Sequence, residues 1–310
     1  MKILITGIHG FVGSNLVAAL SEHHTIYGLD IVSPLKEGVS YTFSWDDLDR
    51  GIIPEIDAII HLAGKAHDTK NKAAAEVYFT VNTGLTQKIY DFFLTSSAWK
   101  FIFFSTAKAA ADRVEGVLTE EVVPAPVGPY GESKIKAEEY IQAHPAPDKQ
   151  VYILRPCMIH GPGNKGNLNL LYNVVEKGIP WPLGAFENKR TFTSIDNLSY
   201  VISGLLTKDV TSGIYNMGDD EALSTNELIE AICDSLGKKA HIWKLSKGLM
   251  NGVAKVGGLL HLPLNPERLQ KLTENYISSN AKIKAALGIE QMPVRAMDGL
   301  KKTLASFARK

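Results

Sequence analysis

Three glycines near the start of the chain, Gly7, Gly10 and Gly13, constrain its fold more than any other feature of the sequence. They follow an apolar run at residues 2–6 and open residues 11–19, whose apolar side chains recur at helical spacing. A strand that turns through glycines into a helix lets the backbone approach a pyrophosphate at the positive end of that helix. The sequence therefore predicts a dinucleotide site lined by Gly7, Gly10, Phe11, Val12 and Gly13.

Asp30 indicates which dinucleotide would bind. It ends the predicted strand 25–29 and lies 17 residues beyond Gly13. A carboxylate at this position accepts hydrogen bonds from the adenosine ribose hydroxyls and repels a 2′-phosphate. We therefore expect NAD rather than NADP, with an ordinary turn residue at a strand end as the alternative interpretation of Asp30.

The order of the predicted elements indicates the fold class. Apolar strands are predicted at residues 2–6, 25–29, 41–44, 58–63, 101–104 and 151–154, and helices at 11–19, 76–94 and 132–143. Apolar strands that alternate with helices are typical of an α/β fold with a doubly wound, Rossmann-type parallel sheet. Beyond residue 156, Pro and Gly become frequent and strand signals become sparse. We expect a Rossmann domain at residues 1–156, to which some later segments return, and a smaller C-terminal lobe at 157–310.

Composition limits the classes of partner. The 33 Lys and Arg residues balance 33 Asp and Glu residues, so no nucleic-acid partner is expected. The two cysteines and the spacing of the nine histidines predict no disulfide framework and no metal site, and they fit a cytoplasmic protein. We expect no signal peptide and no membrane partner, because the chain opens with a strand and has no run of 18 apolar residues. The apolar segment 249–264 is interpreted as buried or lid-like, with a membrane-surface contact as the alternative.

A second pattern points to proton transfer. Tyr130 and Lys134 are four residues apart at the start of a predicted helix, so they share one face. A nearby ammonium group favours the phenolate of a tyrosine, whose free pKa is about 10, and so would the positive ring of a bound nicotinamide. Thr106, or its neighbour Ser105, follows the strand 101–104 at the sheet edge where ligands bind. Alone, such a Tyr–Lys pair is often a chance pair on a helix surface. In a chain that also carries the glycine turn, it predicts hydride chemistry with Thr106, Tyr130 and Lys134 as catalytic residues.

Six further motifs follow one another along nearly the whole chain. They are His61-Leu62-Ala63-Gly64, Asn82 followed by Gly84, Leu154-Arg155-Pro156, His160-Gly161-Pro162-Gly163, residues 190–196 and residues 278–288. Together with the glycine turn and the Tyr–Lys pair, they make the chain resemble the extended short-chain dehydrogenase/reductases, in particular the NAD-dependent nucleotide-sugar epimerase/dehydratase group.

The resemblance implies further roles. Leu62, Ala63, Gly64 and Asn82 would also line the NAD site, and Arg190 would reach the diphosphate of a UDP-sugar substrate. The C-terminal lobe would mainly bind the nucleotide sugar, and a homodimer would form through residues 76–94 and 132–143. Lys108 and Arg268 are further candidate substrate contacts, with a solvated surface charge as the alternative for each.

Two departures from the family pattern bear on the reaction. Ile8 stands where the family often has a glycine, which is tolerable if its φ is negative. The 4,6-dehydratases carry Asp-Glu directly after their threonine, whereas this chain has Ala107 and Lys108. The resemblance therefore implies a 4-epimerase of a UDP-hexose or UDP-N-acetylhexosamine that works through a transient 4-keto intermediate. A reductase or dehydrogenase of a 4-keto nucleotide sugar is the first alternative, and a non-catalytic dinucleotide-binding regulator is an alternative of another class.

Overall fold

The computed structural model describes residues 1–66, 74–164, 166–260 and 264–307. Its centre is a sheet of seven strands in the order β10-β7-β5-β4-β1-β2-β3, and every pairing in it is parallel. The strands are β1 Lys2–Thr6, β2 Thr25–Leu29, β3 Tyr41–Phe43, β4 Ala58–His61, β5 Lys100–Phe104, β7 Gln150–Pro156 and β10 Gly213–Met217. The order reverses between β1 and β4, which is where a doubly wound sheet binds ligands. The predicted Rossmann-type α/β fold is confirmed.

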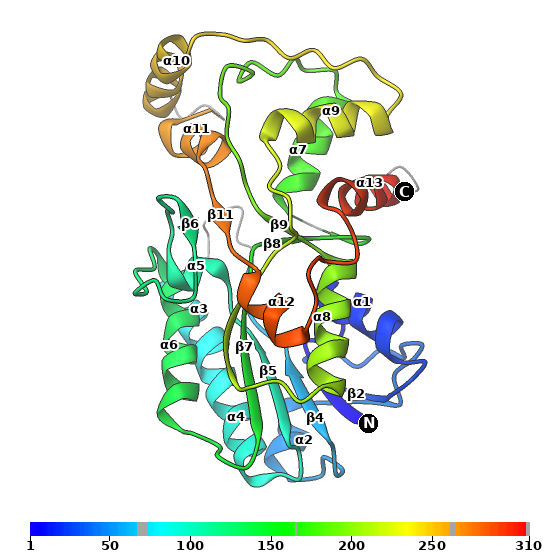
Figure 1. Ribbon diagram of the computed structural model, residues 1–310. Coiled ribbons are helices and arrows are strands. Elements are labelled where there is room, and N and C mark those ends of the chain that lie inside the picture. Colours follow the sequence, from blue (N-terminus) through cyan, green and yellow to red (C-terminus); the bar gives the residue numbers. More distant parts are fainter. Residues whose placement is uncertain (67–73, 165, 261–263, 308–310) are drawn as a thin grey trace.

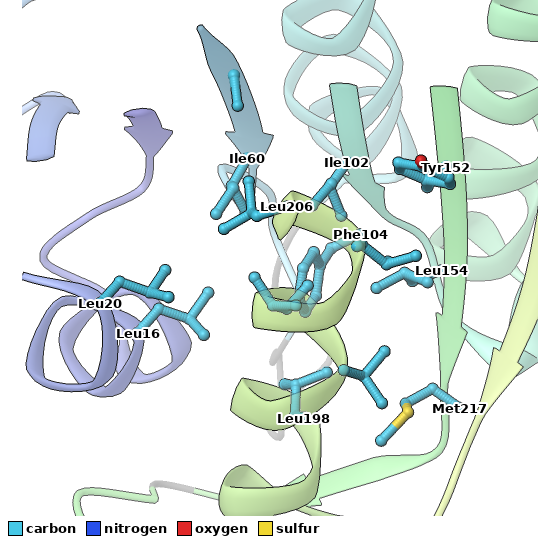
Figure 2. Packing of buried hydrophobic residues seen from close by; sticks show 14 of the residues in the cluster. Leu16, Leu20, Ile60, Ile102, Phe104, Tyr152, Leu154, Leu198, Leu206 and Met217 are labelled. Atoms are coloured by element: carbon cyan, nitrogen blue, oxygen red, sulfur yellow. The ribbon is translucent and has the colours of Figure 1, made fainter. Parts of the chain in front are cut away.

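Helices cover both faces of this sheet (Figure 1). One face packs against α1 Phe11–Leu20, α8 Ile195–Thr207 and α12 Ala281–Leu287. Figure 2 shows Leu206 of α8 beside Ile60 and Ile102 of the central strands, and Leu198 further along the same helix. The other face packs against α4 Leu85–Thr95 and α6 Pro129–Ala143. Both α8 and β10 therefore return to the sheet from beyond residue 156.

The remaining elements lie mostly beyond the carboxyl edge of the sheet (Figure 1). Short elements inserted in the first half are α2 Trp45–Asp49, α3 Ala75–Tyr78, the π-helical η1 Phe79–Gly84, α5 Ala107–Ala110 and β6 Val117–Leu118. The second half adds β8 Met158–His160, α7 Asn167–Glu176, β9 Phe192–Ser194, α9 Thr225–Ser235, α10 Lys247–Leu259, α11 Pro266–Thr273, β11 Ile277–Ser278 and α13 Ala296–Phe307. Residues from α7, α9, α10, α11 and α13 share a separate apolar core. The division at residue 156 remains a proposal.

Two helices differ from the sequence-based expectation. Helix α6 begins at Pro129 and not at residue 132, because proline is favoured in the first helical turn and Gly128 before it has φ +84°. The single helix expected at 76–94 consists of α3, η1 and α4. In the described ranges, no helix is long and apolar enough to span a membrane, and no group of three metal-ligating side chains is found.

Candidate active site

The turn between β1 and α1 has room only for glycine at its key positions. Gly7 has φ +67°, and a Cβ there would lie 3.0 Å from the Ala63 backbone. A Cβ at Gly13 would lie 2.6 Å from the Gly7 carbonyl oxygen. A Cβ is sterically excluded at Gly13, and one at Gly7 would push the turn away from the Ala63 backbone that follows β4.

Ile8 replaces a glycine for a reason in the core. Its side chain is fully buried, and a Cβ at Gly28 of β2 would lie 2.7 Å from Ile8 Cγ2. The isoleucine therefore fills space that Gly28 leaves open, and it anchors the turn to the sheet.

The N-terminus of α1 is open to an anion. Its N-cap is Gly10, which offers no capping side chain, and its first turn contains no acidic residue. Phe11 and Val12 are half-buried there, and Asn15 Nδ2 donates to the carbonyl oxygens of Phe11 (2.8 Å) and Pro162 (3.0 Å). Uncapped helix N–H groups beside a glycine turn fit the pyrophosphate of NAD.

Asp30 lies beside this turn. Its Oδ2 accepts a hydrogen bond from the His9 backbone N–H at 3.0 Å, and its Oδ1 accepts one from the Ile31 N–H at 2.7 Å. The carboxylate is thus fixed at the end of β2, where the ribose of a dinucleotide would lie.

A buried chain of side chains joins the glycine turn to the π-helical segment. Thr6 Oγ1 accepts hydrogen bonds from the N–H groups of Leu62 (3.1 Å) and Ala63 (3.0 Å) and lies 2.7 Å from His61 Nδ1. His61 Nε2 lies 3.0 Å from Thr86 Oγ1, which donates to the Asn82 carbonyl oxygen. Burial is the main cause that lowers the pKa of His61 well below its usual value, so this ring is neutral. It has a packing role within the sheet.

Asn82 holds two parts of the site together. Its Oδ1 accepts from the Lys65 backbone N–H (2.7 Å), and its Nδ2 donates to Ser133 Oγ (2.9 Å) on α6. A Cβ at Gly64 would lie 3.0 Å from Asn82 Oδ1 and 3.2 Å from Lys134 Nζ. The π-helical turn, a feature often found at functional sites, places Asn82 between the loop after β4 and the start of α6.

Thr106 and Tyr130 meet at the carboxyl edge of β5. Thr106 caps α5 by accepting from the Lys108 N–H, and Tyr130 is half-buried in the first turn of α6. Burial raises the pKa of Tyr130, and the side chain of Thr106 acts on this pKa in the opposite direction. In the protein alone Tyr130 is therefore a neutral phenol, and a further positive charge is needed to favour its phenolate.

Lys134 lies one helical turn beyond Tyr130 and is almost fully buried. Its Nζ donates to the Phe104 carbonyl oxygen at 2.7 Å and lies 4.8 Å from the centre of the Phe103 ring. Burial lowers the pKa of Lys134 to about 8, and the charge of Glu138 opposes this shift. Lys134 is thus poised to lose or regain a proton close to physiological pH.

A buried ion pair lies one helical turn beyond Lys134 and connects α6 with the sheet. Glu138 on α6 binds Arg155 of β7, with 2.6 Å between Oε2 and Nη2, and both side chains are at most 2% exposed. The Ser105 hydroxyl also donates to Glu138. Ser105 is therefore committed to this pair, which leaves Thr106 as the hydroxyl beside Tyr130.

Two of the three expected substrate contacts, Lys108 and Arg190, lie beside Tyr276. Lys108 Nζ lies 4.8 Å from the centre of the Tyr276 ring and is ion-paired with Asp112 at 3.0 Å. Arg190 Nη1 donates to the Lys271 carbonyl oxygen of α11 at 2.6 Å. Arg268, one turn earlier on α11, is exposed. Lys108 and Arg190 thus lie near each other beside Tyr276. In the protein without ligand, Lys108 is paired with Asp112 and Arg190 with the Lys271 carbonyl oxygen.

These features have counterparts in known proteins. A family model described as the NAD dependent epimerase/dehydratase family matches residues 3–218. The chain belongs to this family. It is therefore an enzyme of the epimerase/dehydratase type, within the extended short-chain dehydrogenase/reductases, and the family uses NAD.

Individual relatives cover most of the chain. UDP-glucose 4-epimerase of Vibrio cholerae is 30% identical over 260 residues, which are 79% of this chain and 78% of the relative. GDP-6-deoxy-D-mannose reductase of Pseudomonas aeruginosa is 26% identical over 251 residues, which are 75% of this chain and 79% of that relative. The crystal structure of UDP-glucuronic acid 4-epimerase from Bacillus cereus in complex with NAD covers 100% of this chain and 99% of its own, with a TM-score of 0.76 at 22% identity. This last likeness shows the shared fold.

Three residues near the site were not predicted from the sequence. Glu138 and Ser133 lie on the same helix as Tyr130, and Tyr276 arrives from far along the chain. Arg155 carried a usable signal, because a charged residue inside an apolar strand requires a buried acidic partner. No local pattern marks Tyr276.

Proposed function

We propose that this enzyme is an NAD-dependent 4-epimerase of a UDP-hexose or UDP-N-acetylhexosamine. The observation that carries the proposal is the meeting of Thr106 and Tyr130, one turn from Lys134, while Ala107 and Lys108 follow the threonine. Ala107 is buried and Lys108 is ion-paired, so neither position offers the acid that dehydration needs. The likeness to the V. cholerae 4-epimerase supports the same reaction.

The glycine turn and the uncapped N-terminus of α1 fit NAD. The open N-terminus of α1 would hold the pyrophosphate, Asp30 the adenosine ribose, and Lys134 the nicotinamide ribose. A side chain at position 64 would crowd Lys134 Nζ, and Gly64 keeps that space free for the ribose. NAD, when bound, supplies the hydride acceptor for the reacting sugar carbon.

The protein's own residues would then move the proton. Thr106 binds the oxygen on C4 of the sugar, and Tyr130 removes the proton from that oxygen as the carbon is oxidised. Burial raises the Tyr130 pKa, and the Thr106 hydroxyl lowers it. The positive charge of bound NAD, together with the Lys134 ammonium group that would hold its ribose, would lower it further. After the 4-keto sugar rotates to present its other face, C4 takes hydride back and Tyr130 returns the proton to the oxygen. Arg190, Lys108 and Arg268 would hold the UDP diphosphate during this turn.

A 4-keto nucleotide-sugar reductase is the second candidate. The likeness to the P. aeruginosa reductase favours it, and it would use the same three catalytic residues. The two reactions differ in their use of cofactor, because an epimerase regenerates NAD in every cycle and a reductase consumes NAD(P)H.

Incubation of the purified enzyme with a panel of UDP-sugars, without added cofactor, separates the two candidates. We expect NMR to detect the C4 epimer of one substrate. Conversion that requires added NAD(P)H and stops when it is exhausted would instead establish the reductase.

A variant pair tests the proton transfer. Tyr130→Phe removes the reacting hydroxyl, and we expect turnover to fall by about 10²–10⁴-fold with NAD binding retained. Tyr140→Phe, on the same helix, removes a hydroxyl that donates to Asp91 at 2.6 Å, and it should leave turnover unchanged. Unchanged turnover in Tyr130→Phe would contradict the proposed proton transfer. Full biological activity of a Tyr130→Phe variant would instead favour the non-catalytic regulator.

A further inference from the structure

Helix α10 presents an apolar face to solvent. Leu249, Val253, Val256 and Leu260 are 54%, 46%, 53% and 64% exposed, and they recur every three or four residues, so they lie along one side. The buried side chains Met250 and Ala254 face the rest of the lobe. Figure 1 shows α10 at the outer end of the molecule, where it packs against α11. We call the four exposed residues the outer stripe.

The surrounding charge is of one sign. Residues 235–266 contain five lysines and no Asp or Glu, although the whole chain has a formal net charge of zero. Lys247 and Lys255 lie on α10 itself and are exposed. The next acidic residue, Glu267, is ion-paired with Lys271 at 2.6 Å. Trp243, just before the helix, is 53% exposed.

We propose that α10 binds the surface of an anionic lipid bilayer, with its outer stripe among the lipid chains and its lysines at the headgroups. An apolar stripe with flanking lysines and a nearby tryptophan is the pattern of a helix that lies in a membrane interface. The long lysine side chains reach the headgroups while the helix lies deeper, and each adds attraction to anionic lipid.

The charge pattern disfavours a second copy of the chain as the occupant. A symmetric dimer brings the same patch of both copies together, so lysines would face lysines without any acidic partner from this segment. Anionic lipid supplies the missing opposite charge.

The proposal is independent of the reaction assigned to the enzyme, and it revises the expectation that the chain has no membrane partner. Helix α11, against which α10 packs, accepts the hydrogen bond from Arg190 through its Lys271 carbonyl. Figure 1 places α10 at the opposite end of the molecule from α2 and α4, so a bilayer bound at α10 would lie against the second lobe.

Vesicle co-sedimentation of the full chain tests the proposal. We expect binding to vesicles of phosphatidylglycerol and phosphatidylcholine that weakens as salt is raised. A variant with Leu249→Gln, Val253→Gln, Val256→Gln and Leu260→Gln should bind at least tenfold more weakly. The variant Lys247→Gln/Lys255→Gln should bind more weakly and with a smaller salt dependence.

A matched control removes equally exposed apolar side chains elsewhere. Ile52 and Leu170 are 54% and 55% exposed, and Ile52→Gln/Leu170→Gln should bind vesicles like the wild type. Circular dichroism and thermal melts check that every variant is folded. Equal binding to vesicles without anionic lipid, or full binding by the folded stripe variant, would overturn the proposal. Absence of wild-type binding would overturn it too, and a stripe variant that changes from dimer to monomer in light scattering would then identify a second copy of the chain as the occupant.

Discussion

At Gly7, two separate constraints act on one residue: a backbone with φ +67° and an Ala63 backbone 3.0 Å from where a Cβ would lie. Gly51 has the same φ of +67° but nothing within 4 Å of its Cβ position. Gly7→Ala and Gly51→Ala should therefore share the backbone cost of about 1–2 kcal/mol. Only Gly7→Ala should also displace the turn from β4 and weaken NAD binding, by at least tenfold. Calorimetric titration with NAD measures the difference, and unchanged affinity in Gly7→Ala would contradict the proposed NAD site.

Lys134 provides a pH-dependent prediction. Its pKa in the folded protein, about 8, lies below its value in the unfolded chain, about 10.4. Below pH 8 both states carry the proton and the folded state bears the cost of burying it. Between pH 8 and 10.4 the unfolded state binds more protons, so the contribution of Lys134 to stability rises with pH.

Lys134→Met should therefore raise the free energy of unfolding of the NAD-free protein at pH 7, by at most about 3 kcal/mol, and the gain should shrink by pH 10. Urea denaturation at both pH values measures it. Lys136→Met, which replaces an exposed lysine of the same helix, should show no such pH-dependent difference. A constant difference for Lys134→Met would contradict the lowered pKa.

At the scale of elements, the pair Glu138–Arg155 ties α6 to β7, and Ser105 extends it to the end of β5. Removing one charge leaves the other buried without a partner, so Glu138→Gln should destabilise the fold by about 3–5 kcal/mol. Glu138→Leu/Arg155→Leu removes both charges and should recover much of that stability. Thermal and urea unfolding compare the variants, and equal losses for the single and double variants would show that packing, and not the unpaired charge, dominates.

The elements also show what the sequence can predict. The β1–α1–β2 unit and the strands β4, β5 and β7 were found because apolar runs and glycines record their local structure. The strand β10 was not predicted, because its sequence Gly-Ile-Tyr-Asn-Met shows little alternation of apolar and polar residues. It becomes a strand by pairing with β7, which is distant in the sequence. The π-helical turn was not predicted either. It goes with tertiary contacts of Asn82 to the loop after β4 and to α6, and the spacing of apolar residues does not reveal such contacts. Within the site, the motifs placed Thr106, Tyr130 and Asn82, whereas Tyr276 depends on a tertiary return of the chain.

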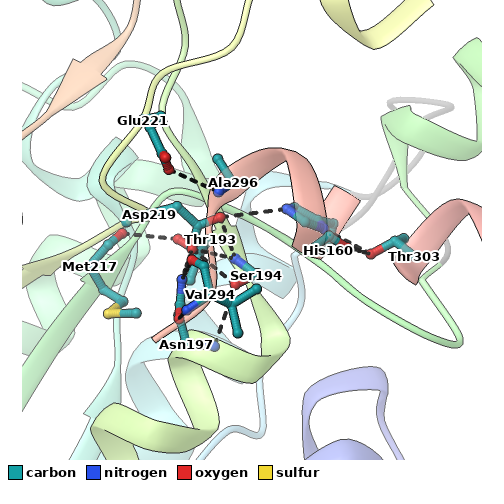
Figure 3. Close-up of polar contacts among 12 residues, drawn as sticks. His160, Thr193, Ser194, Asn197, Met217, Asp219, Glu221, Val294, Ala296 and Thr303 are labelled. Atoms are coloured by element: carbon teal, nitrogen blue, oxygen red, sulfur yellow. Dashed lines mark hydrogen bonds and ion pairs between the residues drawn. The ribbon is translucent and has the colours of Figure 1, made fainter. Parts of the chain in front are cut away.

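At the scale of the whole molecule, Asp219 connects the sheet with the second lobe (Figure 3). It follows β10, is 2% exposed, and accepts hydrogen bonds from the Ser194 N–H (3.0 Å) and from Asn197 Nδ2 (2.7 Å) at the start of α8. His160 Nε2 lies 3.8 Å from its carboxylate, and His160 Nδ1 lies 2.9 Å from Thr303 Oγ1 of α13. One carboxylate thus joins strands and helices that are far apart in the sequence.

Asp219→Asn keeps the shape of this side chain but directs an amide N–H towards groups that are themselves donors. Hydrogen bonds to a buried charge contribute about 1.5–3 kcal/mol each, so we expect a loss of at least about 2 kcal/mol in the free energy of unfolding. Asp49→Asn breaks an exposed ion pair with Lys88 and should cost less than about 1 kcal/mol. Because His160 lies between the Asp219 carboxylate and Thr303 of α13, amide exchange in α13 should also become faster in Asp219→Asn. Urea unfolding and hydrogen-exchange mass spectrometry measure both effects, and a loss no larger than that of Asp49→Asn, with unchanged exchange in α13, would show that the two lobes are joined mainly by apolar packing.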